Sequence, residues 1–174
     1  MSDFAHRLML DQIRGGDRLD LVADDAERNA IAARLDLLSL GQLKAHATVE
    51  RDGEQVRAKG RIQAALEQAC VATGEPVAAM IDEPFELLFL PTPASGGKAD
   101  EEIELDEGEM DTVFYDGGAI DLGSAIADTL SLALDPYPRS ADADAALRQA
   151  GVMAEEEAGP FAALAALKGK LSGE

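Results

Sequence analysis

The stretch LEQACVATGEPV holds the single cysteine of the chain, Cys70. A lone cysteine beside a turn can be a catalytic nucleophile, one ligand of a metal site or a small core residue. A nucleophilic thiol needs a base, usually histidine, and an electropositive setting. The only histidines are His6 and His46, and neither stands in a recognisable catalytic motif. Because Glu67 and Glu75 flank the thiol as well, the sequence disfavours catalysis at Cys70.

The ligand inventory also excludes zinc at Cys70. Structural zinc sites use four cysteine or histidine ligands, usually paired at short spacing. The residue three positions after Cys70 is Thr73, and neither histidine has a nearby partner. Strand parity places Cys70 on the apolar face that carries Ile62, Ala64 and Leu66. We therefore interpret it as a small, mostly buried residue at the end of a strand.

A dense acidic run follows a segment rich in Pro, Ser and Gly. A calcium loop of the EF-hand type needs alternating oxygen ligands, a central glycine and a terminal glutamate between two helices, and Gly108 falls in the wrong place. Like charges this dense destabilise compact structure, so we predict a mobile loop at about 92–111 that is solvated or faces a basic partner. The candidate partner contacts are Asp100, Glu101, Glu102, Glu104, Asp106, Glu107, Glu109 and Asp111.

The stretch VRAKGRI sets Arg57, Lys59 and Arg61 at alternate positions, and hence on one face of a predicted strand. Such a row can contact phosphate, so these three residues are the candidate RNA contacts. No aromatic residues interleave with them for base stacking, and we favour an ordinary solvated sheet face. No Walker A, GxGxxG, HExxH or GxSxG motif is present, and we expect no cofactor.

Composition and charge limit the class of partner. The 174 residues are 47% apolar, enough to bury a core as one domain. Fifteen Lys and Arg face thirty-four Asp and Glu, and the formal charge of -19 either favours basic partners or only provides solubility. One cysteine suits a reducing compartment, and the first residues lack the apolar region of a signal peptide. Without an apolar run long enough for a bilayer, we expect a soluble, cytoplasmic protein.

Apolar spacing predicts the elements that position these residues. A strand near the N-terminus is followed by a helix with Asp24 or Asp25 as N-cap. The Asp52-Gly53 dipeptide predicts a hairpin with a long second strand, in which Gly60 indicates a bend or bulge. A third strand follows TGEP, and its Pro84 indicates an edge position or a bulge.

Beyond the acidic run the pattern predicts further elements. We expect a short strand at Thr112–Tyr115, a Gly-Gly turn and a helix from about Asp121 to Leu134. A C-terminal helical tail at about 141–174 includes Phe161–Leu171, whose apolar residues at helical spacing favour a docked stripe over a free ligand. The fold class is therefore α+β, with a curved, mostly antiparallel sheet that is either open or barrel-like, one helix near the N-terminus and helices toward the C-terminus.

Four separated pieces together resemble the YceD family, also called DUF177, the large ribosomal RNA subunit accumulation proteins. They are ERNAIAARLDL, GRIQAALEQACVATGEPV with EPFELLFLP, GAIDLGSAIADTLSLALDPYPR and GPFAALAALKGK. They occur in the expected order from about Asp20 to Leu171, so the chain is expected to form a single YceD-like domain. The sequence is similar to the alphaproteobacterial branch, which lacks the CxxC pair. Thr73 takes the place of the second cysteine here, so the resemblance implies no metal.

The resemblance implies a non-enzymatic bacterial protein that supports accumulation of 23S rRNA and biogenesis of the large ribosomal subunit. The implied partner is a basic large-subunit ribosomal protein, a ribosomal RNA precursor particle, or both. We expect a monomer that binds neither DNA nor membrane. The alternatives are direct rRNA binding through Arg57, Lys59 and Arg61, an enzyme that uses Cys70 or a carboxylate pair, and a general acidic interaction module unrelated to ribosomes.

Overall fold

The computed structural model describes residues 4–93 and 111–152. The chain divides into two compact units. The larger unit falls within Met1–Gln68 and Ala78–Pro136, and the smaller within Ala69–Val77 and Tyr137–Glu174. Of the expected features, most of the acidic run and the Phe161–Leu171 segment lie outside the described residues.

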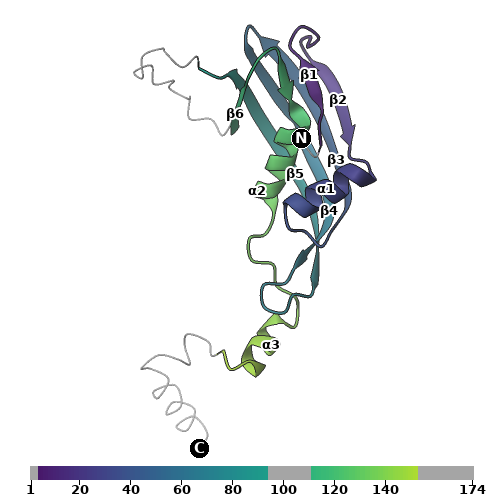
Figure 1. The fold of residues 1–174 in the computed structure, drawn as a ribbon, viewed down its shortest axis with the longest axis vertical. Coiled ribbons are helices and arrows are strands. Elements are labelled where there is room, and N and C mark those ends of the chain that lie inside the picture. Colours follow the sequence, from purple (N-terminus) through teal and green to yellow (C-terminus); the bar gives the residue numbers. More distant parts are fainter. Residues whose placement is uncertain (1–3, 94–110, 153–174) are drawn as a thin grey trace, which may run out of the picture. The chain divides into compact units, whose positions relative to one another are not determined.

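The larger unit is built on an open sheet with the strand order β2–β3–β4–β5–β6 (Figure 1). Neighbours β2, β3 and β4 pair antiparallel, whereas β6 pairs parallel with β5. A second, two-stranded sheet joins β1 to β7. The α+β fold and the mostly antiparallel sheet are confirmed, and the sheet does not close into a barrel. The strands are β1 Arg7–Met9, β2 Asp17–Val22, β3 Ser39–Asp52, β4 Gln55–Ala69, β5 Pro76–Pro91, β6 Asp111–Tyr115 and β7 Ala119–Asp121.

Two helices, α1 (Asp25–Arg34) and α2 (Leu122–Ala133), contribute to the core on one face of this sheet (Figure 1). An ion pair of 3.4 Å between Arg34 and Asp128 joins the two helices. Helix α2 buries Leu122, Ile126 and Leu130 fully, whereas its fourth large apolar side chain, Leu132, is 76% exposed. The opposite face carries mostly polar side chains on β3 and β4, whereas β5 also places apolar side chains such as Leu88 there. The largest fully buried side chains are Phe89, Ile31, Leu43, Ile62, Leu87, Ile120, Leu122, Ile126, Leu130, Val49 and Val56.

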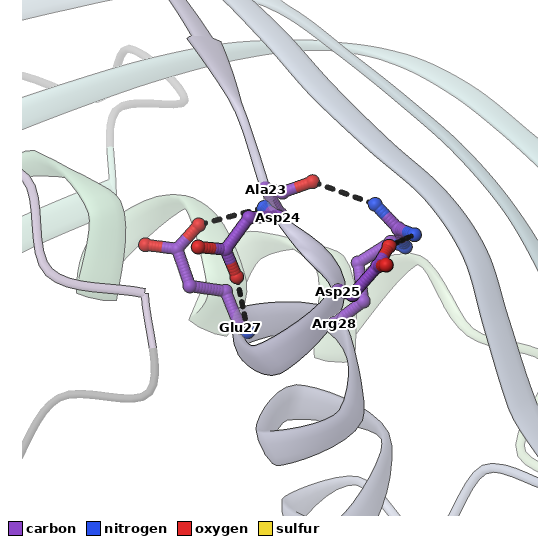
Figure 2. Close-up of polar contacts among 5 residues, drawn as sticks. All are labelled: Ala23, Asp24, Asp25, Glu27 and Arg28. Atoms are coloured by element: carbon purple, nitrogen blue, oxygen red, sulfur yellow. Dashed lines mark hydrogen bonds and ion pairs between the residues drawn. The ribbon is translucent and has the colours of Figure 1, made fainter.

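Helix α1 begins with a complete capping box at Asp24 (Figure 2). The Asp24 carboxylate accepts a hydrogen bond of 2.8 Å from the Glu27 backbone N–H, and the Glu27 carboxylate accepts one of 2.8 Å from the Asp24 N–H. Two N–H groups at the helix start thus gain partners. Arg28 donates to the Ala23 carbonyl at 2.8 Å and also pairs with Asp25. Of the two acids expected as N-cap, Asp24 holds that position.

Replacing Asp24 with alanine is expected to lower the free energy of unfolding by about 1 kcal/mol, because the N-cap acceptor is lost. Asp25→Ala is the matched control. It removes the ion pair to Arg28 and one acidic charge of the first turn but keeps the capping box, so a loss of about 0.5 kcal/mol is expected. Urea unfolding of both variants measures the difference. Equal losses would contradict the role of the capping box.

The hairpin between β3 and β4 is confirmed, with Gly53 and Glu54 as its loop because Asp52 pairs with Gln55. Gly53 has φ 61°, a conformation that glycine adopts without strain. The predicted alternative of a bulge at Gly60 is wrong for the pairing with β3, since that register runs unbroken through the residue, and the alternative of a bend stays a prediction. The irregularity lies in β3 between Leu40 and Gln42.

Pro84 lies in a stretch of β5 where its missing N–H removes no hydrogen bond to β6. Strand β6 is in register only with Leu87–Pro91. Pro84 precedes that stretch, so it lies where β6 does not pair with β5. The edge position predicted from the proline is thus consistent with the pairing.

The smaller unit contains α3 (Ala143–Gln149) and the turn that links β4 to β5. In that turn the Gly74 N–H donates to the Cys70 carbonyl at 2.8 Å, and the Cys70 N–H donates to the Glu75 carbonyl at 2.8 Å. The Val71 N–H donates to the Pro138 carbonyl at 2.9 Å, which joins the turn to the segment before α3. Part of the predicted C-terminal helical tail is therefore helical.

Candidate functional site

The outer face of β4 carries Arg57, Lys59 and Arg61, as their spacing predicts. Between them the strand directs Val56 and Ala58 into the core, where both are fully buried. The three basic side chains retain about half of their possible exposure, at 45%, 55% and 52%. The structure thus places them together on one solvent face.

Each of these cations has a carboxylate of β5 beside it. Glu86 lies 2.8 Å from the Lys59 ammonium and 4.0 Å from Nε of Arg57. Asp82 pairs with Nε of Arg61, and its carbonyl accepts a further hydrogen bond of 3.1 Å from that guanidinium. The charge of the basic row is therefore largely offset within the sheet itself.

A further carboxylate, Asp20, flanks the cations on the side of β2. Asp20 of β2 is in register with His46 of β3, and His46 is in register with Arg61. Nδ1 of His46 lies 2.5 Å from Oδ1 of Asp20. An acid, a histidine, an arginine and the acid Asp82 thus run in one row across four strands. A nucleic-acid backbone approaching this face would meet alternating charges, which weakens phosphate binding.

The pairing acids Asp20, Asp82 and Glu86 were not identified from the sequence. Their partners lie 21 to 29 residues away on neighbouring strands, and only the register brings them together. The sequence does place acids at the outward positions of β5, the strand that lies beside the basic row. That signal becomes useful only once strand order is known.

Cys70 lies just after β4 and is buried as predicted, with 3% of its surface exposed, but it belongs to the smaller unit and not to the core that holds Ile62, Ala64 and Leu66. The backbone N–H of Ser140 donates to its sulfur at 3.3 Å. The Ser140 hydroxyl lies 3.4 Å from the Thr73 hydroxyl, which in turn donates to Glu75 at 3.2 Å. The thiol therefore has a polar setting made by two separate segments of the smaller unit.

These donors lower the pKa of the Cys70 thiol from 9.0 to about 6. The Ser140 hydroxyl is the largest cause, followed by the Ser140 backbone N–H and the Thr73 hydroxyl, while burial acts in the opposite direction. The acidic neighbours in the sequence gave no sign of this shift. Ser140 lies 70 residues from Cys70, so its effect follows from the fold and not from local sequence.

We expect the thiolate of Cys70 to form in the folded protein with a midpoint near pH 6. Because the folded pKa lies below the unfolded one, ionisation stabilises the folded unit fully above the unfolded pKa of 9.0, and this contribution is lost as the pH falls through about 6. Ultraviolet absorbance of the thiolate measures the midpoint. Ser140→Ala should move it upward more than Thr73→Val does, and Cys70→Ser supplies the blank. A midpoint near 9 in the unsubstituted protein would contradict the arrangement.

The candidate contacts for a basic partner are only partly within the described residues. Asp111 is the first residue of β6, exposed and in register with Leu87. The other seven acids of the run, from Asp100 to Glu109, lie outside the part of the chain that the structure describes. Their role stays a prediction.

A hollow of about 260 Å³ opens between β1 and β2. Its lining is mainly aliphatic, from residues such as Leu8, Ile13 and Leu19, with Asp17 and Arg18 also present. The Asp17 carboxylate accepts a hydrogen bond of 2.7 Å from the Arg14 N–H. Within residues 4–93 and 111–152, no group of three or more His, Cys, Asp and Glu is placed to hold a metal ion. None of the described helices has the length and apolar character to cross a membrane.

Comparison with known proteins assigns the chain to a family. No curated protein and no solved structure matches the chain significantly. A family model does match, over residues 58–168, and its description is large ribosomal RNA subunit accumulation protein YceD. The matched region covers well over half of the chain and includes Lys59 and Arg61 of the basic row, the Cys70 turn and α2. The chain therefore belongs to the YceD family, whose role lies in the accumulation of large-subunit ribosomal RNA.

Proposed function

We propose that this protein is a non-enzymatic, cytoplasmic and monomeric factor that supports large-subunit biogenesis by binding a basic ribosomal protein. Membership in the YceD family carries the ribosomal part of the proposal. The acidic residues Asp100–Asp111 are the proposed contacts. Holding a basic ribosomal protein until it meets its RNA would connect this binding to RNA accumulation.

The distribution of charge supports a basic partner over RNA. The formal charge is -19, and the cations on the outer face of β4 are paired with Asp82 and Glu86. A negative surface steers a cationic protein toward it and repels phosphate. The acidic run provides eight of the negative charges within twelve residues, the densest concentration in the chain.

Neutralising six acids of the run is expected to weaken association with large-subunit proteins at least about tenfold at moderate salt, because the carboxylates proposed to contact the partner are lost. The substituted residues become the matching amides. Capture of large-subunit proteins, identified by mass spectrometry before and after nuclease treatment, provides the measurement. The six positions are Glu101, Glu102, Glu104, Asp106, Glu107 and Glu109.

The matched control removes the same number of negative charges elsewhere. Its six positions are exposed in the structure and lie outside the acidic run, so it separates local contact from total charge. We expect its association to stay within about twofold of the unsubstituted protein. An equal loss in both variants would mean that association depends on the total charge and not on contacts of the acidic run. The proposal would be refuted if the unsubstituted protein captured no large-subunit protein. The control positions are Asp11, Glu50, Asp52, Glu54, Glu83 and Asp142.

Direct rRNA binding through Arg57, Lys59 and Arg61 is the second candidate, since the structure brings these three cations to one face. Charge reversal of all three tests it. If RNA contacts this face, reversal abolishes RNA affinity. With the carboxylates of β5 in place, we expect RNA affinity to be weak at physiological salt and little changed by the reversal. If the protein no longer captures large-subunit proteins after nuclease treatment, RNA holds the complex together and direct rRNA binding is favoured.

A further inference from the structure

The two edges of the five-stranded sheet differ in their protection against pairing with another strand. Strand β2 carries Asp17, Arg18 and Asp20 among its six residues, and charged side chains on an edge strand oppose the addition of a further strand. Residues 112–114 at the centre of β6 carry no charge. Within its sheet β6 is in register with β5 alone among the described strands (Figure 1). The edge at β6 is therefore the less protected of the two.

The outer edge of β6 presents the backbone groups of Thr112 and Phe114. The N–H and C=O of one strand residue point toward the same edge, and successive residues alternate. The Thr92 N–H, just after β5, donates to the Tyr115 carbonyl at 2.9 Å, so Tyr115 and Val113 direct their backbone groups toward β5. Thr112 and Phe114 direct theirs away from β5. Another strand can bond there without disturbing the existing ladder.

The side chains at this edge indicate what kind of strand would fit. Phe114 is 54% exposed and gives the middle of β6 an apolar contact surface. Asp111 begins the strand and Asp116 follows it, and both are exposed. In extended backbone these two acids are separated by roughly 17 Å. An apolar centre between two carboxylates is complementary to an extended segment with basic residues near both ends.

We propose that β6 takes up an extended basic segment of a partner protein as an added strand. Thr112 and Phe114 form the main-chain hydrogen bonds, and Asp111 and Asp116 pair with basic side chains of the segment. The inference rests on the proposed function for the partner class, a basic ribosomal protein. It goes further because strand addition requires backbone N–H groups of the partner, which electrostatic attraction alone does not.

A pair of synthetic peptides tests this requirement on the full-length protein. The probe alternates valine and threonine and carries lysines at both ends. Its matched control has the same side chains, but its backbone is N-methylated at alternate residues along the pairing edge. We expect the control to bind at least about tenfold more weakly by calorimetry, because main-chain donors are lost. Equal affinity, or no binding of the unmodified probe, would overturn the proposal.

A pair of protein variants tests the same edge from the other side. Thr112→Pro removes an N–H that points away from β5, a position where an edge strand tolerates proline. Thr112→Ala is the matched control and keeps the N–H. We expect the proline variant to bind the probe at least about tenfold more weakly than the alanine variant, with unchanged thermal unfolding. Equal binding of the two variants would contradict strand addition.

Amide exchange gives an independent result. The N–H groups of Thr112 and Phe114 should exchange fast in the free protein and slowly with the probe bound. Slow exchange in the free protein would mean that the chain itself or a second copy already occupies the edge, which overturns the proposal.

Failure of the inference and failure of the proposed function are distinguishable. If Thr112→Pro captures large-subunit proteins as well as Thr112→Ala does, strand addition is wrong and the proposed function stands. If the peptides discriminate as expected but the unsubstituted protein captures no large-subunit protein, β6 still accepts a basic strand and the proposed function fails.

Discussion

Replacing Gly60 with alanine is expected to lower the free energy of unfolding by about 3 kcal/mol, at the upper end of the usual cost of overpacking. A Cβ at this position would lie 1.9 Å from the carbonyl oxygen of His46 and 2.9 Å from the ring of Phe85. The first of these atoms belongs to the backbone of β3, which is fixed by its register with β4. Backbone cannot move aside as a side chain tip can, so the strands must separate locally.

The control for this substitution is Gly41→Ala in the neighbouring strand. There the nearest atom to an added Cβ is the Ala65 carbonyl oxygen at 3.6 Å, an ordinary contact distance. We expect this variant to stay within about 0.5 kcal/mol of the unsubstituted protein. Urea unfolding measures both. Shortening the neighbouring ring with Phe85→Leu should not rescue Gly60→Ala, because the overlap with His46 remains. Full rescue would show that the ring, and not the backbone, sets the requirement for glycine.

The parts of the sheet that could be predicted are those whose sequence patterns lie within a single strand or turn. The alternation of apolar and polar residues on both sides of Asp52-Gly53 predicted the hairpin and the direction of each side chain. A shift of one residue in the pairing would move the apolar side chains to the solvent face, so a strand with one buried face has a single favourable register. The short strand before the Gly-Gly turn and α2 were also recovered. Strands β1 and β7 were missed, since three residues are too few to show a period. The parallel pairing of β6 with β5 depends on a long connection whose path no local pattern specifies.

The candidate site was predictable in its residue types and not in its electrostatics. The sequence places Arg57, Lys59 and Arg61 on one face, yet their state depends on Asp82 and Glu86, which only strand order brings beside them. Cys70 shows the same limit. Its burial was predicted, but the core that holds Ile62, Ala64 and Leu66 does not include it, and its lowered pKa follows from Ser140, a residue of a distant segment.

The first turn of α2 holds the N-terminal segment through close backbone contact at Gly123. The Leu122 N–H donates to the His6 carbonyl at 3.0 Å, and the Asp121 side chain accepts from the His6 N–H at 3.2 Å. A Cβ at Gly123 would lie 2.1 Å from the Phe4 carbonyl oxygen. The segment that carries the buried Phe4 can therefore pass only over a residue without a side chain.

Gly123→Ala is expected to lower the free energy of unfolding by about 2 kcal/mol, although alanine favours a helix by up to about 1 kcal/mol over glycine. The loss should come from displacement of the N-terminal segment, so amide exchange at Leu122 should become faster.

A double-mutant cycle with Phe4→Ala isolates this cause. Phe4→Ala empties the site of a buried ring, with an expected cost of about 3 kcal/mol, and loosens the segment. Once the segment is loose, the added methyl group no longer meets it and the helix preference of alanine remains. The combined loss should therefore be smaller than the sum of the two by at least about 1 kcal/mol. Simple additivity would mean that Gly123 is required for another reason.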